Sequence, residues 1–374
     1  MNRQEKVYTP LGLYVHVPFC ATQCDYCAFY KEPPFRQNLE HYLRALLLEI
    51  QTIHDERTFD TIYFGGGTPG ILPPKAIDQI AKILHSKMHK IPLEWTVEIA
   101  PNTVSIEKLQ HWKAAGINRI SMGIQSFNEA ILHTLGRKQT SQQIFHAYEL
   151  VRSVGFTNVG IDLIFSAPGQ TSKQLLDDLS TAIALNPEHI STYCLTYEDD
   201  TILKNKLGNG SDENRDHDFY GMICEFLETN GYGQYEISNF CKGNYASAHN
   251  RNTWLMYEWI GVGPSASSQY HGLRYTNIAS LNRWATGIEN NAPERTDVIK
   301  LTKKTLAIDE IIFGLRMNKG VDMEKNIFRQ EVAYLVDDLQ TQGLLAKEKQ
   351  HIRLTPQGRL LCDAIAKEFF NALE

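Results

Sequence analysis

Segments with strand and helix patterns alternate along the first half of this 374-residue chain, and this alternation limits the possible folds more than any other feature. Helices with an apolar face follow short apolar segments of strand character, and Gly116 ends one of these helices. The expected strands span residues 13–17, 61–64, 95–99, 119–124, 158–165 and 189–195. Six such units with short connections predict an α/β fold with a parallel sheet covered by helices.

Two topologies fit this alternation, a doubly wound open sheet and a barrel. In both, binding and catalytic residues gather beyond the carboxyl ends of the strands. Cysteines follow the first expected strand and glycines the second, and Glu98, Gln125 and Asp162 stand on or at the end of the next three. We therefore expect one site at this edge of the sheet.

The cysteines are clustered, since three of the seven fall within eight residues as Cys20, Cys24 and Cys27. Three thiolates at this spacing can converge if the backbone loops around one point, as a metal ion or an iron–sulfur cluster requires. A zinc site completed by His16 or His41 is the structural alternative, although structural zinc sites usually pair two CxxC motifs. Three ligands leave one coordination position open. The remaining cysteines are expected to be buried thiols: Cys194, Cys224, Cys241 and Cys362.

A glycine-rich turn, Gly65-Gly66-Gly67-Thr68, follows the second expected strand. Glycine permits a positive φ and lets a ligand approach the backbone closely. The turn lacks the lysine of a phosphate-binding P-loop, so we do not expect it to bind a nucleoside triphosphate.

Four polar residues stand at or near the expected strand ends: Glu98, Gln125, Arg137 and Asp162. A carboxylate on a buried strand is costly unless it is paired. Taken singly, each residue could belong to a structural ion pair or to a solvated strand end. Taken together, they suit a ligand with an amino-acid head group and a ribose, because carboxylates accept from hydroxyl and ammonium groups and arginine binds carboxylates.

Charge and hydropathy exclude several classes of protein. A formal net charge of −6 and a pI near 6.1 argue against a nucleic-acid partner. The N-terminus is polar and lacks the apolar stretch of a signal peptide, and no apolar segment approaches the roughly 18 residues of a membrane span. We expect a soluble cytoplasmic protein, in which clustered cysteines serve as metal ligands or catalytic thiols.

The second half of the chain changes character. Residues 198–218 are polar and predict a surface loop, and residues 232–275 are rich in aromatic residues and glycine. A further change near Asn291-Ala292-Pro293 suggests a domain boundary. The pattern beyond it, with two helices, two short strands and a last helix from Pro356, predicts a winged-helix-like α+β module.

The motif of Cys20, Cys24 and Cys27, with Glu98 and the segments 66–68, 121–125 and 161–163, resembles the radical S-adenosylmethionine (SAM) superfamily. The resemblance is to its branch containing oxygen-independent coproporphyrinogen III oxidase and the heme chaperone HemW, and it covers nearly the whole chain. In that superfamily three cysteines hold a [4Fe–4S] cluster, and SAM ligates the fourth iron. The fold of the family is a partial (β/α)6 barrel, which matches the six units expected here.

The resemblance implies a role for individual residues. The cluster ligands would be Cys20, Cys24 and Cys27. The cofactor contacts would come from Tyr14, Tyr26, Gly66, Gly67, Thr68, Glu98, Gln125, Arg137 and Asp162. Tyr14 is expected beside the cluster, and the 66–68 turn against the methionine end of SAM. The implied chemistry, transfer of one electron to the sulfonium and release of a 5′-deoxyadenosyl radical, belongs to the cofactors.

Two differences bear on the choice between the oxidase and the chaperone. The oxidase extends its cluster motif with a cysteine two residues after the third, where this chain has Phe29. The oxidase also has a longer N-terminal arm before the first strand. Both differences favour a HemW-like heme chaperone, with the oxidase as the alternative. A zinc-stabilised binding module is a third interpretation, which would leave the polar strand ends unexplained.

A second motif concerns heme. The segment His249-Asn250-Arg251-Asn252-Thr253-Trp254 resembles the HNxxYW motif of HemW, with Thr253 where tyrosine is expected. Neutral imidazole is a common axial ligand of heme iron, which makes His249 the candidate heme-binding residue. The alternative is a hydrogen-bonded histidine in an aromatic core.

These interpretations divide the chain into three regions: a radical SAM barrel over residues 1–230, an extension over 231–295 and a winged-helix-like module over 296–374. The expected ligands are a [4Fe–4S] cluster, SAM and heme. The expected partner is a heme-acceptor protein of unknown identity, and peripheral contact with membrane-bound acceptors is compatible with this role.

Overall fold

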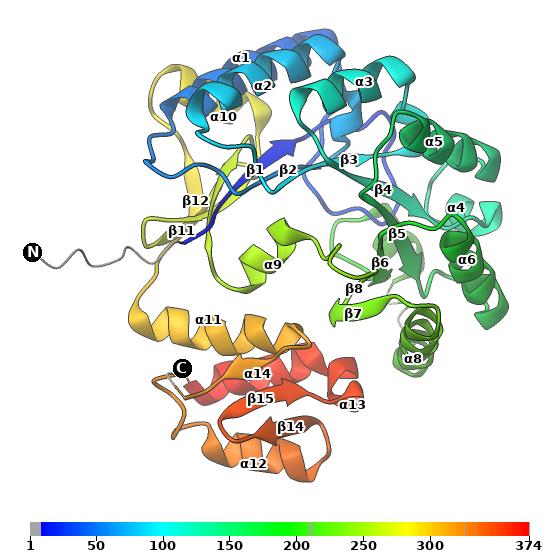
Figure 1. The fold of residues 1–374 in the computed structure, drawn as a ribbon, viewed down its shortest axis with the longest axis vertical. Coiled ribbons are helices and arrows are strands. Elements are labelled where there is room, and N and C mark those ends of the chain that lie inside the picture. Colours follow the sequence, from blue (N-terminus) through cyan, green and yellow to red (C-terminus); the bar gives the residue numbers. More distant parts are fainter. Residues whose placement is uncertain (1–8, 209, 211, 325, 374) are drawn as a thin grey trace, which may run out of the picture.

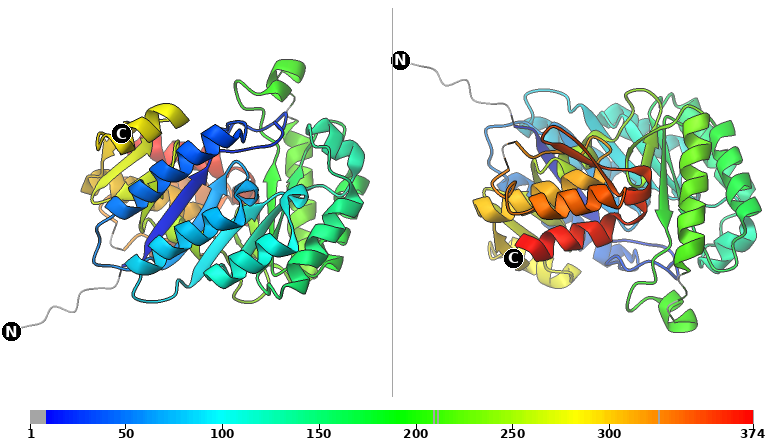
Figure 2. Two further views of the ribbon diagram at one scale, coloured as in Figure 1. Left: turned by 90° about the horizontal axis from the view of Figure 1, so that it is seen from above. Right: turned by 90° about the horizontal axis from the view of Figure 1, so that it is seen from below.

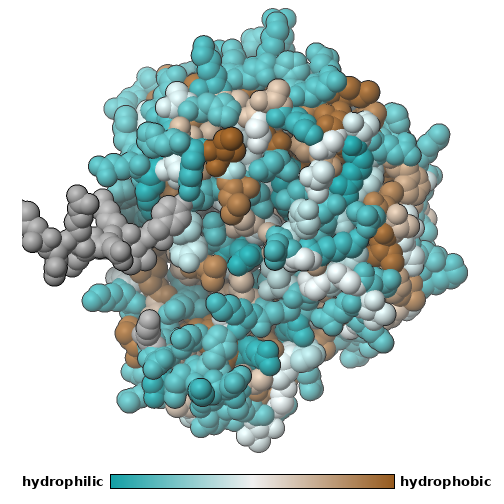
Figure 3. Space-filling model, in the orientation of Figure 1, coloured by the Kyte–Doolittle hydropathy of each residue, from teal (hydrophilic) through white to brown (hydrophobic). Residues whose placement is uncertain are grey.

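A computed structural model describes residues 9–208, 210, 212–324 and 326–373 of the chain. The polar N-terminal segment considered above lies largely outside these residues. Among the helices in the described ranges, none has the length and apolar character needed to cross a membrane. The face shown in Figure 3 is mostly hydrophilic, with apolar residues scattered in small groups.

Six parallel strands form the centre of a twelve-stranded sheet, in which they follow one another in chain order (Figure 1). They are β1 (Leu11–Val17), β2 (Thr61–Gly66), β3 (Glu94–Ile99), β4 (Arg119–Gln125), β5 (Val159–Phe165) and β6 (His189–Cys194). The intervening helices are α1 (Arg36–Thr52), α2 (Pro74–Lys87), α3 (Ile106–Ala115), α4 (Glu129–Thr134), α5 (Ser141–Ser153) and α6 (Ser172–Ala184). Figures 1 and 2 show these helices on the outer side of the curved sheet. The predicted fold class, a partial (β/α)6 barrel, is confirmed.

Side chains alternate along each central strand between the helical layer and the interior of the barrel. On β2, Ile62 and Phe64 are buried in the main hydrophobic core, whereas Tyr63 lines the interior cavity. The same period of two places Glu98 of β3 and Asp162 of β5 on the interior side. The apolar half of each strand therefore anchors the helices, and the polar half is left for the site.

The chain beyond β6 extends both edges of this sheet. At the β6 edge, β8 (Asn239–Cys241) and β7 (Gly233–Glu236) pair antiparallel. At the other edge, β9 (Glu258–Val262) pairs parallel with β1 and is followed by β10 (Ser267–Tyr270), β11 (Leu273–Asn277) and β12 (Arg295–Lys300). The helix α10 (Leu281–Glu289) packs against α1. The strand β12 thus belongs to the main sheet, although it falls within the region assigned above to the C-terminal module.

One local expectation was wrong. The predicted surface loop over 198–218 contains α7 (Ile202–Leu207) and the start of α8 (Glu213–Thr229). The side chains of Thr201 and Asp212 cap these helices by accepting from backbone N–H groups, which explains why short polar sequences become helical there.

A separate hydrophobic core holds the C-terminal module together (lower part of Figure 1). Its helices are α11 (Lys303–Arg316), α12 (Ala333–Thr341), α13 (Pro356–Leu360) and α14 (Cys362–Leu373). Its small antiparallel sheet has the order β13 (Val321–Asp322), β15 (His351–Leu354) and β14 (Leu345–Glu348). This arrangement matches the predicted winged-helix-like pattern. The short helix α9 (Ala248–Trp254) lies between the barrel and the module (Figure 1).

Candidate functional site

A cavity of about 750 Å³ lies inside the barrel and reaches the carboxyl ends of the strands. Its volume is typical of a pocket for a small molecule or cofactor. The predicted site residues that line it are Cys20, Cys24, Tyr26, Cys27, Gly66, Gly67, Thr68, Glu98, Gln125, Arg137 and Asp162. Only two predicted site residues, Tyr14 and His249, are not part of this lining. The structure therefore brings together side chains that are far apart in the sequence.

The cysteine loop is fixed at its base by backbone hydrogen bonds. Cys20 N–H donates to the Glu32 carbonyl at 3.1 Å, and Thr68 N–H donates to the Phe19 carbonyl at 2.8 Å. The Cys20 Sγ lies 3.6 Å from Thr68 Oγ1. The loop after β1 and the turn after β2 thus hold each other, so that the thiols and the glycine turn share one wall of the cavity.

The donor set fits an iron–sulfur cluster. Three partly exposed thiols face one cavity, and burial raises the pKa of the Cys20 thiol. In the described part of the chain, no three His, Cys, Asp or Glu side chains are close enough together to hold one metal ion. Three thiols around one cavity can hold a cluster, because each thiolate of a [4Fe–4S] cluster binds a different iron atom.

The two histidines considered as zinc ligands have other partners. The His16 ring is buried, with Nδ1 3.1 Å from the Tyr14 hydroxyl and Nε2 3.4 Å from the Tyr30 carbonyl. Burial lowers the pKa of His16 to about 4. His41 pairs with Glu289 of α10 at 3.5 Å. Both histidine rings therefore already have partners among the protein's own residues.

The glycines of the turn after β2 are required by close contacts. Gly66 has φ +104°, and a Cβ there would lie 2.6 Å from the His16 ring. A Cβ on Gly67 would lie 2.7 Å from the Phe19 carbonyl oxygen. Any side chain at these positions would push the turn away from the cysteine loop. Both glycines line the cavity, and without side chains they let a ligand approach the turn closely.

Glu98 is a carboxylate held in place from two sides. It accepts a hydrogen bond from the Tyr63 hydroxyl at 2.7 Å and another from the Gly66 N–H group. Burial raises the pKa of Glu98 to about 7, and the negative charge of Asp162 adds to this effect. A ligand that offers an ammonium group or hydroxyls to Glu98 would favour its ionised form.

The remaining polar residues of the wall are connected to one another. Arg137 donates to the Gly123 carbonyl at 2.9 Å and to the Tyr26 hydroxyl at 3.2 Å, which ties the cysteine loop to β4. Its buried Nε atom has no hydrogen-bond partner among the described residues. Asp162 accepts from the Ser121 hydroxyl at 3.3 Å, and burial raises its pKa. An arginine with an unused donor suits the carboxylate of an amino-acid ligand.

Tyr14 and His249 lie behind the cavity wall, where they pack with Tyr63. The Tyr14 ring stacks on Tyr63 with centroids 6.2 Å apart, and the His249 ring stacks on Tyr63 at 5.2 Å. His249 is only 6% exposed, and its Nδ1 lies 2.9 Å from Thr61 Oγ1. Burial lowers the pKa of His249 to about 4, which keeps the imidazole neutral. Its neighbour Asn250 reaches the cavity instead.

Several cavity residues were missed by the reasoning from sequence: Tyr63, Arg119, Ser191, Tyr193, Cys194 and Asn250. Residues two positions apart on a strand lie on the same face of the sheet, and this rule would have identified most of them. Tyr63 shares a face with Gly65, and Arg119 shares a face with Ser121. The expectation that Cys194 is buried was wrong, because it ends β6 at the rim and is exposed. Of the other three, Cys241 and Cys362 are buried and Cys224 is half-buried.

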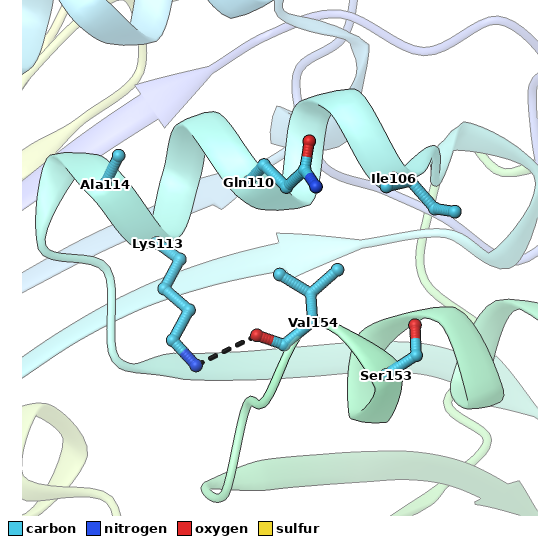
Figure 4. A pocket seen from close by; sticks show the side chains of 6 residues that line it. All are labelled: Ile106, Gln110, Lys113, Ala114, Ser153 and Val154. Carbon is cyan, nitrogen blue, oxygen red and sulfur yellow. Dashed lines mark hydrogen bonds between the residues drawn. The ribbon is translucent and has the colours of Figure 1, made fainter.

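A second hollow, of about 480 Å³, lies on the outer layer between α3 and the end of α5 (Figure 4). Its lining is mixed, and the Lys113 amine donates to the Val154 carbonyl at 2.9 Å. The Lys113 side chain therefore links α3 to the loop that follows α5. The hollow offers no convergent set of polar groups comparable with the interior cavity.

Comparison with known proteins agrees with this geometry. Residues 14–182 match the model of the Radical SAM superfamily, and residues 301–361 match the HemN C-terminal domain. The solved structure of coproporphyrinogen III oxidase (HemN) from Escherichia coli superimposes with a TM-score of 0.84 at 26% identity, covering 96% of this chain and 90% of that chain.

Curated relatives extend the match over nearly the full length. Heme chaperone HemW of Lactococcus lactis is 32% identical over 96% of this chain and 97% of its own. Heme chaperone HemW of Bacillus subtilis is 33% identical over 96% of this chain and 99% of its own. Radical SAM proteins use a [4Fe–4S] cluster and SAM, which the cavity can accommodate. The chain therefore belongs to the radical SAM superfamily and, within it, to the HemW family.

Proposed function

We propose that this protein is a HemW-like heme chaperone, which binds a [4Fe–4S] cluster, SAM and heme and transfers heme to an acceptor protein. The observation that carries the proposal is the match to relatives named heme chaperone HemW, at 32% and 33% identity over 96% of this chain. The match includes the barrel, the segment with His249 and the C-terminal module. Phe29, at the position of the additional oxidase cysteine, supports the same choice.

In this proposal the cofactors occupy the interior cavity. Cys20, Cys24 and Cys27 bind the cluster, and the Gly66–Thr68 turn receives the methionine end of SAM. The other cofactor contacts come from Tyr26, Glu98, Gln125, Arg137 and Asp162 on the cavity wall. Tyr14 acts from behind the wall, through its contacts with His16 and Tyr63. When bound, the cluster and SAM supply one-electron chemistry.

Heme binding is assigned to His249. Its imidazole is neutral, as an axial ligand must be, but the ring is buried against Tyr63 and its Nδ1 is occupied by Thr61. Heme iron can reach the ring only if α9 moves or the side chain rotates out. Because α9 lies between the barrel and the C-terminal module, such a movement would be the step that takes up and releases heme.

The oxidase remains the second candidate, because the chain also superimposes on HemN of E. coli with a TM-score of 0.84. A single anaerobic preparation can separate the two functions. After reconstitution with iron and sulfide, heme is titrated and the Soret band is followed, while a parallel sample receives coproporphyrinogen III, SAM and a reductant. The chaperone shows a saturable Soret band, passes heme to an acceptor and gives no decarboxylated product. Robust turnover to protoporphyrinogen would reverse the assignment.

A further inference from the structure

Tyr63 contacts both candidate ligand regions at once. From β2, its hydroxyl donates to Glu98 Oε1 at 2.7 Å on the cavity wall. The face of its ring stacks on His249 of α9, with centroids 5.2 Å apart and an interplanar angle of 28°. One side chain therefore joins the wall expected to bind SAM to the helix expected to bind heme.

The space around this side chain leaves it little freedom. A Cβ added to Gly65 would lie 3.0 Å from the Tyr63 ring, 3.1 Å from the Tyr14 ring and 3.2 Å from Glu98 Oε1. The absence of a side chain at Gly65 is what allows these three groups to meet. Tyr14 supports the Tyr63 ring from the side, at a centroid distance of 6.2 Å. The Tyr63 ring is thus packed in one cluster with the rings of Tyr14 and His249, whose own centroids are 6.5 Å apart, and its hydroxyl is directed at Glu98.

We propose that Tyr63 is a positioning residue for SAM: it holds the Glu98 carboxylate toward the cavity, and the His249 ring braces it in that position. The proposal rests on the assignment of Glu98 as a SAM contact in the proposed function. It goes further, because it assigns His249 an effect on SAM binding that requires no heme.

The physical basis is the cost of a buried carboxylate. Glu98 is faced by Tyr14 of β1, Tyr63 of β2, Arg119 of β4, Asp162 of β5 and Tyr193 of β6. The Tyr63 hydroxyl is its closest side-chain donor, and this hydrogen bond lowers the pKa of Glu98 against the effect of burial. Without the hydroxyl, Glu98 is protonated at higher pH, and the ionised form that accepts from an ammonium group or hydroxyls is less populated at neutral pH.

The first test measures SAM binding by calorimetry from pH 6 to pH 9 on the reconstituted protein. Tyr63→Phe keeps the ring and its stack but removes the donor. We expect affinity about tenfold weaker at pH 7, because less of the Glu98 carboxylate is ionised there, and recovery toward the wild-type value at pH 9. Tyr245→Phe, which removes an exposed hydroxyl outside the cavity, is the matched control and should leave the whole pH profile unchanged.

The second test measures how much the stacking of the His249 ring on Tyr63 contributes to SAM affinity. His249→Leu fills the space behind Tyr63 without a ring to stack on, and we expect SAM affinity several-fold weaker. The same substitution in the Tyr63→Phe background should have little further effect, because the two residues act through one hydrogen bond. Additive losses, or identical pH profiles of wild type and Tyr63→Phe, would overturn the proposal. Failure of the wild type itself to bind SAM would instead overturn the proposed function.

Discussion

Thr61 Oγ1 and His249 Nδ1 lie 2.9 Å apart, although 188 positions separate them in the chain. This hydrogen bond fixes the N-terminal end of α9 to the inner side of β2. At the other end of α9, the Trp254 ring packs against Phe313 of α11 at 5.8 Å. The segment with the heme motif is therefore attached to the barrel by its histidine and to the C-terminal module by its tryptophan.

The cluster assignment predicts that each motif cysteine is required for iron binding. Anaerobically reconstituted wild type should be brown and give the EPR signal of a reduced [4Fe–4S] cluster, whereas Cys20→Ser, Cys24→Ser or Cys27→Ser should lose most of both. Cys194→Ser is the control, because this exposed thiol lines the same cavity without belonging to the motif. Stoichiometric zinc with no iron after reconstitution would contradict the assignment.

Heme binding should depend on His249. We expect His249→Ala to weaken heme affinity by about tenfold or more, equal to a loss of about 1.4 kcal/mol or more, while iron content stays at the wild-type level. The measurement is a titration followed at the Soret band, with iron analysis on the same sample. His271→Ala provides the control, since its side chain is exposed. Unchanged affinity in His249→Ala would leave this histidine a purely structural role.

Glu94 should contribute strongly to stability, because its buried carboxylate caps α9. It accepts from Ala248 N at 2.8 Å, His249 N at 3.1 Å and Ser247 Oγ at 3.2 Å. Glu94→Ala should lower the free energy of unfolding by about 2–4 kcal/mol, since three donors lose their acceptor. Denaturant titration measures this change. Glu149→Ala, on the exposed side of α5, should change it by less than about 0.5 kcal/mol. Equal effects of the two variants would show that the cap is unimportant.

Glu49 should make stability depend on pH. Burial raises its pKa to about 7, although Gly263 N–H, the Trp284 indole and the Asn277 amide donate to it. The folded state then holds a proton that the unfolded state releases near pH 4.5, so the contribution of Glu49 to stability is present below pH 4.5 and is lost as the pH rises to 7.

The matched variant for this pH dependence is Glu49→Gln, which resembles the protonated acid. Its free energy of unfolding should be close to that of the wild type at pH 4 and higher at pH 8, by an amount on the order of 3 kcal/mol. Denaturant titrations at the two pH values give the difference. A constant difference between wild type and variant across this range would contradict a raised pKa.

The sequence predicted the barrel well because its signals are local. Each apolar strand segment, and the helix-ending Gly116, follows from spacing or from the preference of one residue for one backbone conformation. The cysteine loop and the glycine turn could be placed in the same cavity because parallel strands all end at one edge. The site residues themselves came from a family motif as well as from this rule.

The pairing of distant segments could not be predicted from local signals. The parallel ladder between β9 and β1, and the burial of His249 against Tyr63, depend on contacts between segments separated by about half of the chain or more. The sequence left two interpretations of His249 open, a heme ligand or a hydrogen-bonded core residue. The ring has the second environment here, and the first role requires a change in conformation.

The ladder between β1 and β9 also determines when the strand that leads into the cysteine loop is paired on both edges. Tyr14 of β1 stands opposite Gly261 of β9, so β1 keeps an open edge until the ribosome has made the chain through Val262. During synthesis the N-terminal half emerges first, and such an unpaired edge is prone to aggregation. Loading of the cluster is therefore expected to follow translation of the extension, although its ligands are among the first residues made. A nascent chain arrested before β9 would carry all three thiols and no finished strand to hold them.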